Sequence, residues 1–207
     1  MAFKINKMKH YEAIIDDIPK DAVIVMCGLP ATGKSTVAKR IAEAKDFTLL
    51  SSDIIRLEML KGEDIFDQKV ASDMKKRLMV YERMFSRAGQ IMEKGKGVIL
   101  DATFITQELR KQAAAIAHRN EKPFYIIETR CIPEVAIKRI RKRSKDRYES
   151  NAITEDAYFN NLRIFEPVAI RDICDSFPGI RISYFLINTD SEDSKDWFIE
   201  REGGPDG

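Results

Sequence analysis

The chain has 207 residues, of which 44% are hydrophobic and 33% charged, as expected for one domain with a buried core and a charged surface. The formal net charge of +2 excludes an overall positive coat for nucleic acid or membrane surfaces, so any basic site must be local. The three cysteines are odd in number and form no C-x-x-C pair, which suits a reducing compartment. No apolar run approaches the roughly 20 residues of a membrane span, and residues 1–17 lack the uninterrupted apolar segment of a secretory signal. We therefore predict a cytoplasmic protein without membrane contact.

Residues 1–20 are interpreted as an N-terminal helical extension, and the main domain is expected over 21–190. The first predicted strand, 21–27, leads into GLPATGKST at 28–36, and a helix is predicted over 34–45. This stretch matches the phosphate-loop pattern G-x-x-x-x-G-K-[ST] in the strand–loop–helix context that the motif requires. We therefore predict an ATP site formed by Gly28, Leu29, Pro30, Ala31, Thr32, Gly33, Lys34, Ser35 and Thr36.

The residue types in this loop explain how it would hold a nucleotide. Gly28 and Gly33 let backbone N–H groups turn inward around phosphates, and the helix N-terminus adds positive potential. Lys34 is expected to bridge the β- and γ-phosphates during catalysis, and the Ser35 hydroxyl is expected to hold Mg²⁺. The alternative is a glycine turn before an ordinary helix.

The second predicted strand, 47–52, is followed by the sequence DIIRLEML. Asp53 and Arg56 therefore fall at the same sheet edge as the phosphate loop, one helical turn apart if a helix begins here. Asp53 can then accept the proton of an acceptor hydroxyl, and Arg56 can hold an anionic group of that acceptor. The alternative is that Asp53, or Ser52, only caps the helix.

The next segments decide between uses of the phosphate. A helix predicted over 68–94 carries five basic residues that form either a substrate wall or a solvated face: Lys75, Lys76, Arg77, Arg83 and Arg87. The third predicted strand, 97–102, ends in LDAT without a water-activating glutamate after Asp101, which argues against a motor ATPase. No N-K-x-D follows a later strand, which argues against a guanine-nucleotide switch. Transfer of the phosphoryl group to an acceptor remains.

A basic helix follows the fourth predicted strand, 124–131. Within the helix predicted over 133–143, Arg139 and Arg143 are four residues apart and share one face. Clustered arginines opposite a phosphate loop suit a lid over ATP, expected over about 139–153. The alternative is a solvated basic face.

The remaining elements complete an α/β pattern. Further helices are predicted over 106–119 and from a cap at Thr154 to near Pro167, and the last strand over 181–189. Residues 191–207 are interpreted as an acidic tail with a weak helix and a frayed end. Alternating strands and helices predict a three-layer P-loop fold, with a five-stranded mainly parallel sheet and a helical lid.

Four motifs, in this order, resemble P-loop kinases similar to phage 5′-polynucleotide kinase and small kinases with the same ATPase domain. They are GLPATGKST, the D-x-x-R from Asp53 to Arg56, LDAT at 100–103 and R-x-R-K-R from Arg139 to Arg143. The stretches FEP at 165–167 and INTD at 187–190 also look like the small kinases. The resemblance spans about residues 21–190.

The resemblance implies a role for each matching residue. Asp53 would be the general base, Arg56 would hold a phosphate of the acceptor, and Asp101 would orient Arg56. Arg139 and Arg143 would stabilise the transferring phosphoryl group. Thr103, in the LDAT stretch, is placed with the substrate-binding residues Arg56 and Asp101.

We therefore expect an ATP- and Mg²⁺-dependent kinase that phosphorylates a hydroxyl acceptor. The acceptor is left open between a nucleic-acid 5′-hydroxyl and a nucleoside or small molecule, because the chain has no extended basic groove and Phe104 stands where a polar residue is expected. Toxin-type kinases and kinases of sugar acids or aminoacyl-tRNA are the related alternatives. An ATP-binding regulatory module without phosphoryl transfer is the alternative from another class, and the oligomeric state is left open.

Overall fold

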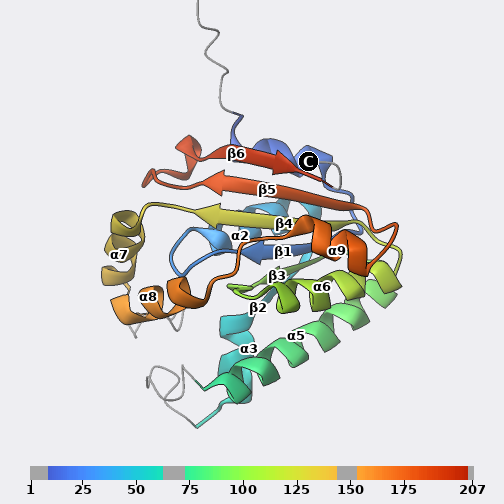
Figure 1. Cartoon of the computed structure of the whole chain (residues 1–207), viewed down its shortest axis with the longest axis horizontal. Coiled ribbons are helices and arrows are strands. Elements are labelled where there is room, and N and C mark those ends of the chain that lie inside the picture. The colour runs from blue at the N-terminus through green and yellow to red at the C-terminus, as the bar shows by residue number, and fades with distance from the viewer. Residues whose placement is uncertain (1–8, 63–72, 144–152, 205–207) are drawn as a thin grey trace, which may run out of the picture.

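One six-stranded sheet forms the centre of the computed structural model, which describes residues 9–62, 73–143 and 153–204 (Figure 1). The strand order is β2-β3-β1-β4-β5-β6; β1 to β5 pair in parallel, and β6 pairs antiparallel with β5. The bounds are Val23–Cys27 (β1), Thr48–Ser51 (β2), Val98–Asp101 (β3), Phe124–Arg130 (β4), Ile182–Asn188 (β5) and Phe198–Gly203 (β6). The predicted α/β fold with a mainly parallel sheet is confirmed.

Helices connect these strands, and α2 has the predicted bounds. The helices are η1 (Tyr11–Ala13), α1 (Ile14–Asp17), α2 (Lys34–Lys45), α3 (Ser52–Met59), α5 (Met74–Glu93), α6 (Gln107–Arg119), α7 (Pro133–Arg141), α8 (Glu155–Ile164), α9 (Ile170–Ser176) and η2 (Ser194–Asp196). Thr154 caps α8 as predicted, because its side chain accepts from the Ala157 N–H. The helix α9 was not predicted. Residues 68–72 of the predicted long helix and 144–152 of the predicted lid lie outside the described residues.

The central strand is buried on both faces, which explains its unbroken apolar sequence. In β1, Val23, Val25 and Cys27 belong to a core cluster with residues of α5, α6 and α9. Ile24 and Met26 belong to a second cluster with residues of α1 and α2. Two covered faces make a three-layer arrangement, as is usual for parallel sheets. Among the described helices, none combines the length and apolar character needed to cross a bilayer.

The prediction of a five-stranded sheet and a weakly helical tail is wrong for residues 198–203. These residues form β6, the edge strand beside β5. Ile199 and the preceding Trp197 are buried in the same cluster as α1 and α2, and this burial outweighs the acidic, polar character of the surrounding sequence. The N-terminal helices join this cluster through Ile14 and Ile18, so both ends of the described chain pack on the domain.

The parallel register brings the functional segments to one edge. Met26 of β1 and Ser51 of β2 both lie opposite Asp101 of β3, so these three strands end at nearly the same level. The segments that follow these strands therefore emerge side by side at the carboxyl edge of the sheet, where α/β proteins bind ligands.

Candidate active site

Three residues with positive φ shape the phosphate loop, residues 28–36. Gly28, Ala31 and Gly33 have φ angles of 130°, 63° and 88°. A Cβ added at Gly28 would lie 2.4 Å from the carbonyl oxygen of Thr129 in β4, so only glycine fits there. Ala31 takes a left-handed conformation although it has a side chain, and such strain persists only where the surroundings hold the backbone.

Buried threonines hold this backbone from behind. The Thr32 hydroxyl donates to the Leu29 carbonyl at 2.9 Å and lies 2.8 Å from the Thr129 hydroxyl. The Thr189 hydroxyl, at the end of β5, donates to the Thr32 carbonyl at 2.9 Å. Each bond satisfies a polar group that would be costly to leave unpaired in the interior. The loop is therefore fixed to the ends of both β4 and β5.

Lys34, the first residue of α2, is buried at the base of the site. Its Nζ donates to the Leu29 carbonyl at 2.6 Å. Burial lowers the pKa of Lys34, whereas the negative charge of Asp101 raises this pKa and the positive charge of Arg143 lowers it. The cation of Lys34 thus lies within electrostatic reach of both residues.

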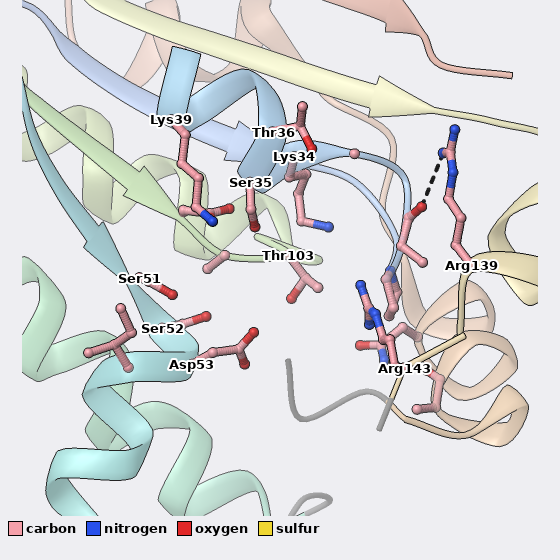
Figure 2. Close-up of a pocket in the computed structure, with 18 of the residues that line it drawn as sticks. Lys34, Ser35, Thr36, Lys39, Ser51, Ser52, Asp53, Thr103, Arg139 and Arg143 are labelled. Atoms are coloured by element: carbon pink, nitrogen blue, oxygen red, sulfur yellow. Dashed lines mark hydrogen bonds between the residues drawn. The ribbon is translucent and has the colours of Figure 1, made fainter. Parts of the chain in front are cut away.

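A pocket of about 1130 Å³ opens beside the loop (Figure 2). Figure 2 shows Lys34, Asp53, Thr103 and Arg143 pointing into one space from four segments of the chain. Gly28, Leu29 and Thr32 contribute to the loop without lining the pocket. The predicted site residues that line it are Pro30, Ala31, Gly33, Lys34, Ser35, Thr36, Asp53, Arg56, Asp101, Thr103, Arg139 and Arg143.

Asp53 lies in the first turn of α3 and does not cap it. The N-cap position is Ser51, and its side chain makes no capping hydrogen bond. The alternative that Asp53 or Ser52 is the cap is therefore wrong. The Asp53 carboxylate instead faces the phosphate loop across the pocket (Figure 2).

Asp101 ends β3 beside the start of α2. Burial raises the pKa of Asp101, hydrogen bonding from Ser35 and the charge of Lys34 lower this pKa, and the charge of Asp53 raises it. A hydroxyl at the start of the loop helix and a carboxylate at the end of a neighbouring strand are the donors with which P-loop proteins hold Mg²⁺. Ser35 and Asp101 therefore fit a magnesium site. The pairing of Asp101 with Arg56 stays a prediction.

The far side of the pocket, called the helical wall here, consists of pocket-lining side chains of α3, α5 and α8. The sequence did not place Tyr81 or Asn161 in the site. It indicated Arg77 only as one of five basic residues of the long helix, without distinguishing it from the other four. Arg77 donates to the Asn161 amide oxygen at 2.9 Å. Tyr81 lies 3.5 Å from the Thr103 hydroxyl. The signal for Tyr81 was its place on the apolar face of the long helix. The helical wall consists of Ser52, Asp53, Ile54, Arg56, Arg77, Val80, Tyr81, Ala157 and Asn161.

Thr103 is held by its neighbour Phe104, whose φ of 43° is unusual for an aromatic residue. The Phe104 N–H donates to the Tyr81 hydroxyl at 3.1 Å, and its carbonyl accepts from the buried Arg110 at 3.0 Å. The Thr103 carbonyl accepts from the Gly28 N–H at 3.2 Å. An apolar residue after Thr103 therefore suits this loop, since the Phe104 ring is fully buried.

Arg139 lies within α7 and Arg143 lies just after its end, and the two differ in their contacts. The Arg139 guanidinium donates to the carbonyls of Ala31 at 3.3 Å, Thr189 at 2.7 Å and Ser191 at 2.7 Å. Arg143 projects into the pocket opposite Asp53 (Figure 2). The structure brings both to the phosphate loop, and their catalytic roles stay predictions.

Comparisons with known proteins agree with this geometry. Residues 23–168 match the family AAA_33, described as an AAA domain. The comparison with curated proteins gave no match. Among solved structures, a protein of Chloroflexus aurantiacus proposed to be a kinase is 19% identical with a TM-score of 0.63, covering 85% of this chain and 94% of that one.

Two further structures share the fold. A gluconokinase from Sinorhizobium meliloti 1021 is 14% identical with a TM-score of 0.53, covering 82% of this chain and 84% of its own. Kti12 of Chaetomium thermophilum, in complex with ADP-AlF3, is 18% identical with a TM-score of 0.57, covering 84% and 92%. The family match extends over most of the chain and includes the phosphate loop, Asp53 and the α7 arginines, and the chain therefore belongs to the AAA_33 family, with the fold of AAA-type P-loop kinases.

Proposed function

We propose that the protein is a kinase that transfers the γ-phosphoryl group of ATP to a hydroxyl acceptor. The observation that carries the proposal is the position of Asp53, which faces the phosphate loop across the pocket (Figure 2). Lys34 of the loop and Arg143 point into the same pocket. A carboxylate opposite the phosphates is placed to serve an acceptor, which is what distinguishes a kinase from a nucleotide-binding module.

In the proposed reaction, the acceptor oxygen forms a bond to the γ-phosphorus while the bond from that phosphorus to the β–γ bridging oxygen breaks. The Asp53 carboxylate takes the hydroxyl proton, and ADP leaves with the bridging oxygen. Lys34 and Arg143 lie where they can offset negative charge on the transferring group. Arg139, the third predicted catalytic cation, also lines the pocket.

Ser35 and Asp101 are the residues that would hold Mg²⁺ here. The ion would neutralise charge on the β- and γ-phosphates. Ser35 is then the direct protein ligand, as predicted from the sequence, and Asp101 assists it. This assignment adds a role to Asp101 beside its predicted orientation of Arg56.

The acceptor is proposed to carry an anionic group. Arg56 and Arg77 both line the pocket on the helical wall, and a guanidinium group pairs well with phosphate or carboxylate. Both a nucleic-acid 5′-end and a sugar acid satisfy this requirement, and the likeness of fold to a gluconokinase supports testing the latter. A cytoplasmic location is proposed with this activity.

The proposal is tested with γ-labelled ATP, Mg²⁺ and a panel of acceptors: 5′-hydroxyl oligonucleotides, nucleosides, gluconate and neutral sugars. We expect label to reach one acceptor class, and Asp53→Asn to lower this transfer by about 10²- to 10⁴-fold. Affinity for ADP should stay within about twofold, because the base acts on the acceptor and not on the nucleotide.

Glu58→Gln is the matched control, since Glu58 lies on the same helix, is exposed and pairs with Arg87. Its transfer rate should equal that of the wild type. If label appears only as free phosphate, equally in wild type and Asp53→Asn, the kinase proposal fails. Tight ATP binding with no transfer to any acceptor would favour the regulatory module instead.

A further inference from the structure

Arg139 and Trp197 both line the pocket and make a cluster of contacts with the phosphate loop. The Arg139 guanidinium binds the Ala31 carbonyl within the loop and the Thr189 and Ser191 carbonyls after β5. Its Cζ also lies 5.5 Å above the centre of the Trp197 ring. One side chain of α7 thus joins the loop to the chain that follows β5, and an arginine suits this because its planar group both stacks and donates several bonds.

Trp197 packs directly against the second loop glycine. A Cβ added at Gly33 would lie 2.6 Å from the Cη2 atom of the Trp197 ring, so the ring occupies the space that a side chain would need. The Trp197 indole N–H donates to the Ser191 carbonyl at 2.8 Å, the same oxygen that Arg139 binds. The centre of the Trp197 ring also lies 5.8 Å from the centre of the Tyr11 ring. Trp197 is only 4% exposed, so its orientation is fixed.

These contacts fall on two of the three residues of the phosphate loop that have a positive φ. Arg139 binds the carbonyl of Ala31, and Trp197 covers Gly33, and both of these residues have positive φ. A backbone held in sparsely populated conformations needs surroundings that determine it. The cluster supplies this constraint from Arg139 in α7 and from Trp197, which precedes β6 and lies beyond the family match over residues 23–168.

We propose that Arg139 and Trp197 are positioning residues that hold the phosphate loop in its nucleotide-binding conformation. The inference rests on the proposed function only in taking the loop as the nucleotide site. Arg139 then contributes to nucleotide binding, because it holds the backbone of the loop. Arg143 remains the cation near the end of α7 that acts on the transferring phosphoryl group. Trp197, the only tryptophan of the chain, is then also a reporter of the loop.

ADP separates the two roles, because it occupies the loop but has no γ-phosphoryl group. Arg139→Met should weaken ADP binding by about tenfold or more, measured by calorimetry, and lower kcat/KM by a similar factor. Arg143→Met should leave ADP affinity within about twofold and lower kcat. A result in which Arg139→Met lowers kcat with unchanged ADP affinity would overturn the inference and restore Arg139 to the transition state.

The role of Trp197 is tested with two substitutions of Trp197 and one of its equally buried neighbour Tyr11. Trp197→Leu should weaken ADP binding by about tenfold, and Trp197→Phe, which keeps an aromatic ring for Arg139 to stack on, should restore it to within about threefold. Tyr11→Leu removes a buried ring that contacts Trp197 but does not line the pocket, so it should lower Tm with ADP affinity within about twofold. Circular dichroism verifies that each variant is folded.

Wild-type fluorescence completes the test, because ADP should change the emission of Trp197 with the same Kd as calorimetry. Equal loss of ADP affinity in Tyr11→Leu and Trp197→Leu would show general destabilisation and overturn the inference. Unchanged ADP affinity in Trp197→Leu would also overturn the inference, but it would leave the kinase proposal intact. If wild-type protein binds no ADP, both proposals fail; if it binds ADP but phosphorylates nothing, only the kinase proposal fails.

Discussion

The phosphate loop and the helical wall face each other across one pocket but are built in different ways. The loop presents backbone, and buried side chains such as Thr32 and Thr189 hold that backbone from behind. The helical wall presents side chains from three helices, of which Asp53 and Arg77 are half-buried. Substitutions on the wall can therefore change which molecule binds without disturbing the fold, whereas the loop tolerates almost no change.

The largest effect is expected where the loop leaves no space. Gly28→Ala would combine an unfavourable φ of 130° with a Cβ placed 2.4 Å from the Thr129 carbonyl oxygen. The free energy of unfolding should fall by about 3 kcal/mol or more, and ADP binding should be lost. Urea denaturation and calorimetry measure the two effects.

Gly89→Ala provides the comparison, because Gly89 lies inside α5 and a Cβ there would meet nothing within 4 Å. This variant should be stabilised by about 0.5–1 kcal/mol with unchanged ADP affinity. A Gly28→Ala protein as stable as the wild type would mean that the loop can shift, and the contrast between loop and wall would lose its basis.

A smaller effect, confined to the acceptor, is expected on the wall. Arg77→Gln removes a cation that lines the pocket but lies away from the loop, so the KM for an anionic acceptor should rise by about tenfold or more. The KM for ATP should stay unchanged. Steady-state kinetics with the acceptor found in the labelling assay measure both constants.

Arg83→Gln is the control for this variant, since Arg83 is an exposed basic residue of the same helix outside the pocket. It should leave both constants unchanged. Equal losses for ATP and acceptor in Arg77→Gln would place Arg77 in a part of the pocket shared by both substrates and remove the distinction between the two sides.

The same contrast explains what the sequence could predict. The phosphate loop was predictable residue by residue, because its glycines, lysine and serine have a fixed spacing within one short stretch and each meets a local backbone or charge requirement. Asp53 was predictable from the end of its strand. The pairing of Arg77 with Asn161 was not, since these residues are far apart in sequence and meet only through tertiary packing.

The β6 edge shows the same limit. Residues 200–202 of β6 are charged and exposed, as suits an edge strand, and a charged stretch is also typical of a tail. Only Trp197, Phe198 and Ile199 indicated burial, and three apolar residues within a charged stretch do not predict a strand. The contact of Trp197 with Gly33 depends on the fold of the whole domain.

An intermediate effect on stability is expected at the support behind the loop. Thr189→Val keeps the shape of the side chain but removes the hydroxyl that donates to the Thr32 carbonyl. The buried carbonyl loses a partner, so the free energy of unfolding should fall by about 1–2 kcal/mol, measured by urea denaturation. Ser176→Ala, which removes an exposed hydroxyl bond within α9, should cost less than about 0.5 kcal/mol. Equal losses would indicate that the support behind the loop is no stronger than a surface bond.

The smallest effect is a gain in stability and concerns Asp101, which lines the pocket between the phosphate loop and the helical wall. Burial raises the pKa of Asp101, which means that its charged form is unfavourable in the folded protein. Asp101→Asn should therefore raise Tm by about 2–4 °C at pH 7, the shift that about 1 kcal/mol makes in a domain of this size. Phosphoryl transfer should fall at the same time, because the carboxylate beside Ser35 is lost.

The dependence on pH identifies the charge as the cause. A carboxyl group whose pKa is raised on folding binds protons more tightly in the folded state, so the penalty for its ionisation is present at neutral pH. This penalty disappears as the pH falls through the raised pKa of Asp101 toward the unfolded value of about 3.9. The Tm difference between Asp101→Asn and wild type should therefore shrink between pH 7 and about pH 4, as measured by scanning calorimetry. A difference that stays constant over this range would mean that shape or hydrogen bonding, and not the buried charge, sets the stability at this position.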